Sequence, residues 1–364
     1  MAVGNRAMEL LYYSRLLWRP HDQIVLLQES YGQFEVALRL PLHPDAKRLF
    51  AEQKAWIEHH VKPAIFRARH DLKTGDIGKS RAERSYRRWC LAQRLFLNPI
   101  NDLGPYLAGA SDPLVLPGIR ATVAEGPWHL GFFNAMKQEF ASARYMAFAG
   151  THSRAVHFSD RRVSLANTLD YPAYSYATEQ IKTSFRIAYS LFDKIAFFLN
   201  TYLALNIPDK LVSFRTLWYD DYKRKRLRPA VVSLPYSALK ALFWLAKDFY
   251  EEASGLPASL EPEARQLAAT RNHLEHKYLK VHLPEWRGVA PLDDLTVQSL
   301  ADRLAFSVRR DDFVDKTVRL LQLVRSALLY LACTVHQQET LSTKIRKARS
   351  VPIVLDEWRD DWKY

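Results

Sequence analysis

Cysteine is scarce in this chain, which has only Cys90 and Cys333 among its 364 residues. Two cysteines cannot build a metal cluster by themselves, and their scarcity favours a reducing compartment. His273 and His276 are three residues apart, but no carboxylate pair stands at a spacing that would complete a metal site. We therefore expect neither a metal centre nor a bound cofactor.

The chain also lacks a long apolar run. The longest apolar stretches, near Ile195–Leu205 and Ala327–Val335, carry polar residues and fall short of the roughly 20 residues that cross a bilayer. Arg6, Glu9 and Arg15 interrupt the apolar residues at the N-terminus, which argues against a signal peptide. These features predict a soluble, cytoplasmic protein that has no membrane partner.

Acidic residues are too few to balance the basic ones. The chain has 39 Asp and Glu against 52 Lys and Arg, a net charge of +13 and an isoelectric point near 9.6. Such an excess favours an acidic partner such as RNA or a membrane surface. Apolar residues make up 48% and charged residues 25%, which is ordinary for a globular protein and excludes long disorder.

Strand patterns are almost absent. Only Phe34, Val36, Leu38 and Leu40 alternate with period two, and with Ile24–Leu27 they predict a short hairpin around Tyr31-Gly32. Elsewhere apolar residues recur at intervals of three and four, which predicts a mainly α-helical protein. Helices are expected at residues 6–19, 44–71, 81–97, 128–150, 174–205, 235–253, 261–280 and 311–345.

A glycine-containing break at residues 74–78 favours a domain boundary near residue 80. Residues 1–80 would then form an accessory region of short helices and the hairpin. Residues 81–364 would form the main helical domain.

Histidine is unevenly distributed, since His273, His276 and His282 fall within ten positions. Arg271 stands five residues before His276 and is followed directly by Asn272. All three lie in a predicted helix, where residues five apart point about 140° from each other. Arg271 and His276 could address one group only if the helix loosens at His276 or if a second copy of the chain contributes. A permanent cation, a titratable imidazole and an amide suit attack on a phosphodiester by a ribose hydroxyl.

A plainer interpretation remains open at this stage. Arg271 could pair with Glu275 four residues later on an exposed helix face. His276 could be a half-buried histidine near the end of a helix.

The segment RNHLEHKYLKV resembles the R-x-x-x-x-H signature of HEPN domains, the all-helical "higher eukaryotes and prokaryotes nucleotide-binding" family. Further segments resemble a bacterial HEPN subfamily that is often fused to helical repeats, and the resemblance extends from residue 86 to about 340. These segments are YRRWCLAQRLFLNPINDL (86–103), GFFNAMKQEFASARYM (131–146) and SLFDKIAFFLNTYL (190–203).

The resemblance implies a HEPN-type helical bundle with its core at about residues 174–345. It implies a metal-independent endoribonuclease in which His276 handles a proton of the 2′-hydroxyl or of the leaving oxygen. Arg271 would stabilise the phosphorane charge, and Asn272 would orient the imidazole or hold the phosphate. The two motifs of a homodimer would meet in one cleft. A role as a toxin or antiviral defence effector acting on RNA follows from the same resemblance.

Four more residues are expected to support the site. His273 and Glu275 lie beside the motif, and Asp193 stands where HEPN proteins often have an acidic or polar residue facing it. Tyr278 extends the motif to R-x-x-x-x-H-x-Y, which resembles HEPN toxins whose tyrosine is adenylylated by a partner antitoxin. Tyr278 could equally pack its ring under the bundle, and Asp193 could be an ordinary surface residue.

A basic segment, WYDDYKRKRLRP, precedes the 235–253 helix. Its basic residues are expected to bind RNA, because bases stack on aromatic rings while cations follow the phosphates. They are Lys223, Arg224, Lys225, Arg226 and Arg228. A solvated loop, partly neutralised by Asp220 and Asp221, is the competing interpretation.

Two further functions stay open beside the ribonuclease. One is a non-catalytic RNA- or nucleotide-binding HEPN module that acts as a partner subunit. The other is a structural helical adaptor, in which the positive charge and the histidine cluster are incidental.

Overall fold

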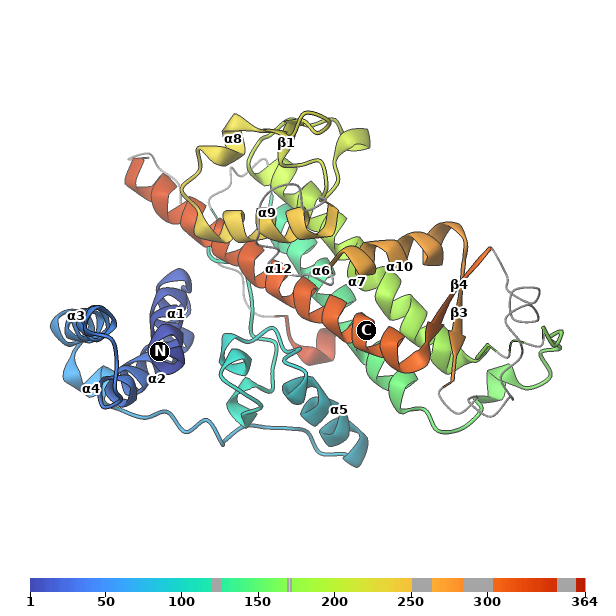
Figure 1. Ribbon diagram of the computed structural model, residues 1–364, viewed down its shortest axis with the longest axis horizontal. Coiled ribbons are helices and arrows are strands. Elements are labelled where there is room, and N and C mark those ends of the chain that lie inside the picture. The colour runs from blue at the N-terminus through green and yellow to red at the C-terminus, as the bar shows by residue number, and fades with distance from the viewer. Residues whose placement is uncertain are drawn as a thin grey trace. The chain divides into compact units, whose positions relative to one another are not determined.

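The computed structural model describes residues 1–119, 126–168, 170, 172–250, 264–283, 304–345 and 358–363. The described chain is mainly helical, as predicted (Figure 1). It divides into two compact units. The first unit comprises Met1–Pro127 and Ala332–Tyr364, and the second comprises Trp128–Leu331. The sequence-based boundary near residue 80 remains a prediction.

Short helices make up the N-terminal part of the first unit. Three of them begin with Pro20, Pro44 and Pro63, which suit a first turn because its N–H groups have no partner inside the helix. The elements are α1 (Ala2–Leu16), α2 (Pro20–Leu38), α3 (Pro44–His60), α4 (Pro63–Phe66), α5 (Arg81–Ala92) and the 3₁₀ turns η1 (Pro99–Asp102) and η2 (Leu107–Gly109). A further turn, η6 (Asp360–Trp362), lies near the C-terminus.

The predicted N-terminal hairpin is wrong, because helix α2 occupies its place. Leu26, Ser30, Phe34 and Ala37 are buried, and their spacing of three and four is that of one helix face. Val36, which belonged to the alternating pattern, is 50% exposed on the other side. The short alternation from residue 34 to 40 was therefore a chance feature of an amphipathic helix.

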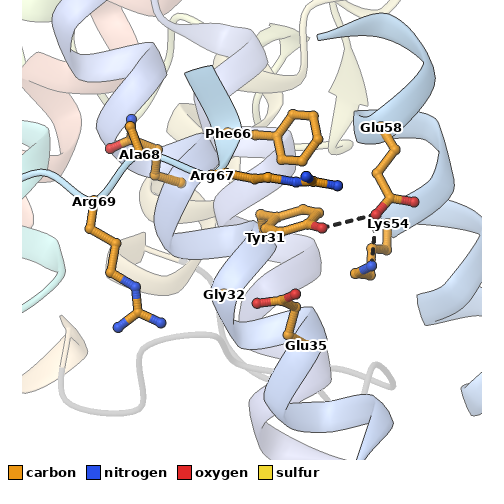
Figure 2. Close-up of a pocket in the computed structure, with 10 residues that line it drawn as sticks. Tyr31, Gly32, Glu35, Lys54, Glu58, Phe66, Arg67, Ala68 and Arg69 are labelled. Carbon is orange, nitrogen blue, oxygen red and sulfur yellow. Dashed lines mark hydrogen bonds and ion pairs between the residues drawn. The ribbon is translucent and has the colours of Figure 1, made fainter. Parts of the chain in front are cut away.

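Helices α2 and α3 are joined by a polar contact at the Glu58 carboxylate. Figure 2 shows Tyr31 and Lys54 directed at this carboxylate, which accepts hydrogen bonds from the Tyr31 hydroxyl (2.9 Å) and Lys54 Nζ (2.8 Å). Hydrogen bonds from Lys54 and Tyr31 hold the pKa of Glu58 below its usual range. The three side chains line a polar cavity of about 390 Å³.

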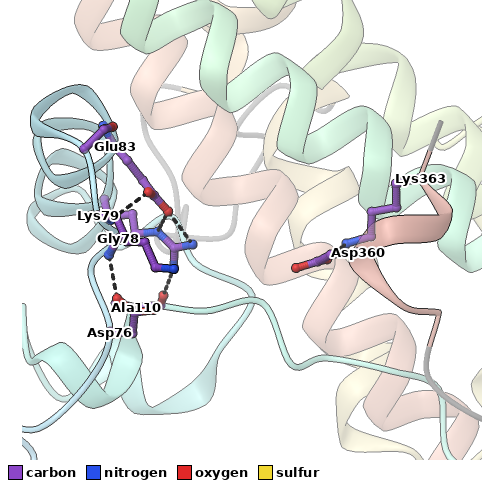
Figure 3. Close-up of polar contacts among 9 residues, drawn as sticks. Asp76, Gly78, Lys79, Glu83, Ala110, Asp360 and Lys363 are labelled. Carbon is purple, nitrogen blue, oxygen red and sulfur yellow. Dashed lines mark hydrogen bonds and ion pairs between the residues drawn. The ribbon is translucent and has the colours of Figure 1, made fainter.

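Helix α5 begins with a well-defined capping arrangement (Figure 3). Ser80 Oγ accepts the Glu83 N–H (3.0 Å), and Glu83 Oε2 accepts the Lys79 N–H (3.0 Å). Both bonds satisfy amide donors near the helix start, which a helix leaves unpaired. Gly78 has φ +91°, and a Cβ there would lie 1.9 Å from Glu83 Cδ, so this turn requires glycine. The predicted interruption between helices before residue 81 is confirmed.

The second unit contains the helices predicted downstream, with ends shifted by a few residues. It comprises α6 (Trp128–His152), η3 (Phe158–Asp160), α7 (Tyr176–Tyr202), η4 (Asp209–Leu211), β1 (Tyr219–Asp221), β2 (Arg226–Leu227), α8 (Pro229–Val232), α9 (Ser237–Tyr250), α10 (Ala264–His276), β3 (Tyr278–His282), β4 (Ala305–Arg309) and the start of α12 (Arg310–Ile345). Residues 261–263 of the predicted motif helix lie outside the described residues.

Aromatic side chains on α7 form the centre of this unit. Phe192 lies 4.9 Å from Phe214 and 5.0 Å from Phe249 of α9, and Phe185 lies 5.6 Å from Phe313 of α12, between ring centres. Helix α6 runs beside α7 (Figure 1). The core therefore includes a helix that begins well before residue 174.

Two small sheets interrupt the helices, although the sequence predicted no strand in this region. β1 and β2 form an antiparallel hairpin, and β3 pairs in parallel with β4, Tyr278 opposite Ala305. The motif helix therefore ends at His276 instead of continuing to residue 280. Strands of two to five residues are too short to show a reliable alternation in the sequence.

Helix α12 is long and apolar enough to cross a membrane, judged by length and composition alone. However, 72% of its most apolar window, within Arg310–Leu341, is buried inside the structure. The core helix of a soluble protein has this property, so the helix is weak evidence for a membrane span.

Candidate functional site

Helix α10 has a buried, mainly apolar face and an exposed polar face. Leu267, Thr270 and Leu274 are buried, and their spacing of three and four fixes the inward face. Asn272 and His276, four residues apart, are exposed on the other side. The polar half of the motif therefore remains accessible to a ligand.

Arg271 and His276 come together within one chain. Arg271 Nη1 lies 3.4 Å from His276 Nε2 and 3.4 Å from Asn272 Oδ1. The angular objection drawn from an ideal helix is overcome because α10 ends at His276 and the guanidinium is long enough to reach the ring. Arginine has no acceptor, so Nε2 accepts in this contact and its lone pair is directed at the Arg271 guanidinium.

Glu275 does not pair with Arg271, contrary to the plainer interpretation. Glu275 Oε1 lies 3.4 Å from Arg186 Nε on α7, and Arg186 Nη2 donates to the Leu274 carbonyl (3.0 Å). Glu275 therefore joins α10 to α7 and leaves the Arg271 guanidinium to the motif. Arg186 had no signal in the sequence, because its partner lies 88 positions away.

His273 is not part of the cluster around Arg271. Its ring stacks on Phe306 of β4, with 4.6 Å between ring centres, and Nδ1 lies 2.9 Å from the Ala269 carbonyl oxygen. These contacts join α10 to the parallel sheet, so the ring supports the position of the helix.

Tyr278 begins strand β3 and is 41% exposed, so its ring is not packed under the bundle. Two residues on, the Lys280 side chain is only 4% exposed and donates to Asp170 Oδ2 (2.5 Å). This ion pair anchors the strand that follows His276. Adenylylation of Tyr278 stays a prediction, which the intact mass of protein from its native host would test.

Tyrosines of α7 and α9 lie next to Arg271. The guanidinium carbon of Arg271 is 5.5 Å from the centre of the Tyr189 ring, and the Tyr189 and Tyr250 hydroxyls are 2.9 Å apart. Burial, together with the charge of Asp193, raises the pKa of both hydroxyls. Both tyrosines therefore remain protonated at neutral pH.

Asp193 lies near this tyrosine pair, and its Oδ1 accepts the backbone N–H of Phe214 (2.9 Å). The carboxylate therefore holds the segment that leads to the β1–β2 hairpin. The sequence indicated Asp193 but missed Tyr189, which stands four residues earlier on the same face of α7.

The comparisons with known proteins identify the family. Residues 121–338 match the family model described as LA2681-like HEPN. The chain belongs to the LA2681-like HEPN family. No curated protein and no solved structure matches the chain. The matched region contains the Arg271–His276 pair, and it is shorter at its N-terminal end than the predicted resemblance from residue 86.

The basic residues of this HEPN chain are distributed over the β1–β2 hairpin. Lys223, Arg224, Lys225 and Arg226 are exposed. Arg228 is instead held by Asp220 (2.8 Å) and by the backbone carbonyls of Tyr219 (2.7 Å) and Leu217 (3.2 Å). Four of the five predicted RNA-binding residues are thus exposed, and RNA binding by them stays a prediction, whereas Arg228 stabilises the hairpin.

The aromatic residues of the hairpin differ from the sequence-based interpretation. Trp218 and Tyr219 are buried, so they do not offer rings for base stacking. Tyr222 is half-buried, with Lys225 Nζ 3.8 Å from its ring centre. Burial would raise the pKa of the Tyr222 hydroxyl, but the nearby Arg215 and Lys225 side chains outweigh it and lower that pKa.

Proposed function

We propose that this HEPN protein is a metal-independent endoribonuclease. The observation that carries the proposal is the accessible contact between Arg271 Nη1 and His276 Nε2, 3.4 Å apart, in a chain of the HEPN family. A fixed cation beside an imidazole acceptor supplies both needs of RNA cleavage: removal of a proton and stabilisation of developing phosphoryl charge.

In the proposed reaction, the Arg271 guanidinium leaves His276 Nε2 for the phosphate when RNA binds. The freed Nε2 then accepts the proton of a ribose 2′-hydroxyl. The 2′-oxygen then attacks the adjacent phosphorus, and the bond from phosphorus to the 5′-oxygen of the next nucleotide breaks. The leaving 5′-oxygen takes up a proton, so the products are a 2′,3′-cyclic phosphate and a 5′-hydroxyl end. Arg271 contacts the non-bridging oxygens as their negative charge grows, because its planar fork suits phosphate geometry.

Asn272 contributes a neutral amide to the same site. Its Oδ1 is 3.4 Å from Arg271 Nη1, so the amide helps to hold the guanidinium against His276. Its NH₂ group is then available to a phosphate oxygen. No metal ion or cofactor is needed for these steps.

A homodimer would complete the proton transfers. One His276 can accept the 2′-proton while the His276 of a partner chain donates to the leaving oxygen. We place the two motifs on either side of one cleft, related by the two-fold axis of a symmetric dimer.

The biological setting proposed here is toxin-like or antiviral RNA cleavage in the cytoplasm. Such an activity requires restraint, so an antitoxin or regulatory partner would accompany it. Tyr278, exposed two residues after His276, is the position at which a covalent modification could block access to the site.

Cleavage of total RNA in the presence of EDTA tests the proposal. Wild-type protein should produce fragments with cyclic phosphate ends, and His276→Ala should slow cleavage by about 100-fold or more. Arg271→Ala should slow it by a similar factor, because the charge on the transition state loses its partner. His282→Ala is the matched histidine control and should retain activity, since the His282 ring contacts Ser307 on β4.

Equal cleavage by wild type and by both motif variants would show that the activity comes from a contaminant. Tight RNA binding by a wild type that cleaves nothing would favour the non-catalytic HEPN module instead.

A further inference from the structure

A line of side chains rich in hydrogen-bond donors leads from the motif through α7 and α9 to the β1–β2 hairpin. It consists of Tyr189, Tyr250, Arg215 and Tyr222, which we call the tyrosine–arginine track. Tyr189 is buried, Tyr250 and Tyr222 are half-buried, and Arg215 is exposed. Arg271 lies over its first ring, Tyr189, and the Tyr189 hydroxyl contacts that of Tyr250. The track therefore begins at the proposed catalytic arginine.

The other end of the track reaches the basic hairpin. The guanidinium carbon of Arg215 is 5.7 Å from the Tyr250 ring centre and 4.5 Å from that of Tyr222. Arg215 Nε donates to the Tyr222 hydroxyl (2.7 Å), and Lys225 of the hairpin lies over the same ring. A series of side-chain contacts thus joins the motif to the exposed cations between β1 and β2.

The tyrosine pair has one hydroxyl hydrogen to spare. Two hydroxyls that share one hydrogen bond use one of their two hydrogens, and within the described residues neither hydroxyl has another acceptor. Because both groups stay protonated at neutral pH, the second hydrogen is a permanent donor. Arg271 lies over the Tyr189 ring of this pair, and Arg215 lies over the Tyr250 ring.

Arg215 is exposed and only partly used. Its Nε–H is bound to Tyr222, while its Nη groups have no acceptor among the residues that the structure describes. Asp193, whose charge acts on the tyrosine pair, is bound through Oδ1 to the Phe214 N–H. The surface therefore offers donors and positive charge, which suits successive phosphates of a nucleic acid rather than a cationic or apolar ligand.

We propose that the tyrosine–arginine track is a second nucleotide subsite, in which Arg215 holds the phosphate next to the scissile one. This inference rests on the proposed ribonuclease function. The half-buried Tyr250 donates the spare hydroxyl hydrogen to an oxygen of the nucleotide between the two arginines, and the strand continues to the exposed basic residues of the hairpin. The ligand is single-stranded RNA, because 2′-oxygen attack needs a ribose and phosphate that are free to rearrange outside a duplex.

Binding of an uncleavable RNA separates this subsite from catalysis. A fluorescent hexamer with 2′-O-methyl groups throughout is titrated at several salt concentrations. Arg215→Ala should weaken binding about tenfold and reduce the slope of log K against log salt by about 0.7, the value for one phosphate contact in a single strand. Arg215→Lys should lose less affinity and keep the slope, because its charge remains.

Two further variants sharpen the test. The double variant Tyr189→Phe, Tyr250→Phe should weaken binding several-fold without changing the slope, since hydroxyls carry no charge. Lys240→Ala is the matched charge control and should bind like wild type. It removes an exposed cation of α9 that precedes Tyr250 by ten residues, about 15 Å along the helix. Thermal melting of each variant confirms that it is folded.

The outcomes distinguish the two proposals. Wild-type affinity and slope in Arg215→Ala would overturn the subsite, even if the wild type cleaves RNA. A tenfold loss in Arg215→Ala, with no cleavage of the unmodified hexamer by wild type, would support the subsite and overturn the ribonuclease. Failure of wild type to bind the hexamer would overturn both.

Discussion

At the scale of single residues, the site depends on side chains that are held by neighbours and not by the motif alone. Arg271 is free to reach His276 because Glu275 is engaged by Arg186. The strand that follows His276 is anchored by Lys280, which is buried against Asp170. This ion pair holds the strand in place only while both side chains are charged. A buried cation without its partner would lower the free energy of unfolding.

Asp170→Asn should therefore lower the free energy of unfolding by about 2 kcal/mol at pH 7. Partial burial alone would raise the pKa of Asp170, but hydrogen bonds from Lys280 and Thr168 outweigh it and hold the pKa below its usual range. A carboxylate with a lowered pKa contributes stability above its unfolded pKa of about 4, and loses it as the pH falls through the folded value. Urea denaturation at pH 7 and near pH 3 measures both effects.

The difference between wild type and Asp170→Asn should shrink at the lower pH. Asp45→Asn serves as the control, since its ion pair with Arg48 is highly exposed and should contribute little. An unchanged stability of Asp170→Asn at pH 7 would contradict the anchoring role.

At the scale of elements, the β1–β2 hairpin divides its basic residues into two kinds. Arg228 is bonded to Asp220 and to two backbone carbonyls, so it belongs to the structure of the hairpin. The cations from Lys223 to Arg226 are exposed, although Arg224 pairs with Asp221 and Lys225 lies over the Tyr222 ring. RNA binding and hairpin stability should consequently respond to different substitutions.

Replacing Lys223, Arg224, Lys225 and Arg226 together by Gln should weaken RNA binding without regard to sequence. The slope of log K against log salt should fall by about 0.7 for each phosphate contact that is lost. Arg228→Ala should instead lower the melting temperature, because it removes bonds inside the hairpin. Salt titrations with two unrelated RNA oligomers and a thermal melt provide the measurements. An unchanged slope in the fourfold variant would show that the exposed residues are only solvated surface.

At the scale of the whole molecule, the net charge of +13 favours an acidic partner such as RNA, and the proposed ribonuclease is a dimer. Arg271 and His276 already meet within one chain, so a partner is not needed to bring them together. What a partner would add is a second His276 to protonate the leaving oxygen. The mass of the particle in solution therefore tests dimerisation. The dependence of activity on the number of intact His276 side chains tests the two-histidine reaction.

Light scattering at tens of micromolar should give twice the 42.2 kDa of one chain. Mixing wild type with His276→Ala tests whether each cleavage needs two histidines. With subunits exchanged at equal amounts, activity should fall to about one quarter if both chains must contribute, but to about one half if each chain cleaves independently with its own histidine. Activity from a strict monomer would reject the dimer.

The sequence by itself determined the helical class and most of the helix positions. Long segments such as α7, α9 and α12 show apolar residues at intervals of three and four, and that period survives any tertiary arrangement. At α2, four alternating apolar residues obscured the helical period. Short strands such as β3 have too few residues to show a reliable alternation. Tertiary packing decided those elements.

The motif positions were also visible in the sequence, since Arg271, Asn272 and His276 stand on one predicted helix. The contact between Arg271 and His276 was not visible in the sequence. Residue spacing fixes the direction of the Cα–Cβ bonds, but not how far a long arginine side chain reaches at a helix end. Other elements contribute Tyr189, Tyr250, Arg215 and Arg186, and only the folded structure brings Tyr189 beside Arg271 and connects the other three to the site. Chain periodicity determines which face a residue occupies, whereas contacts between distant elements decide what that face can bind.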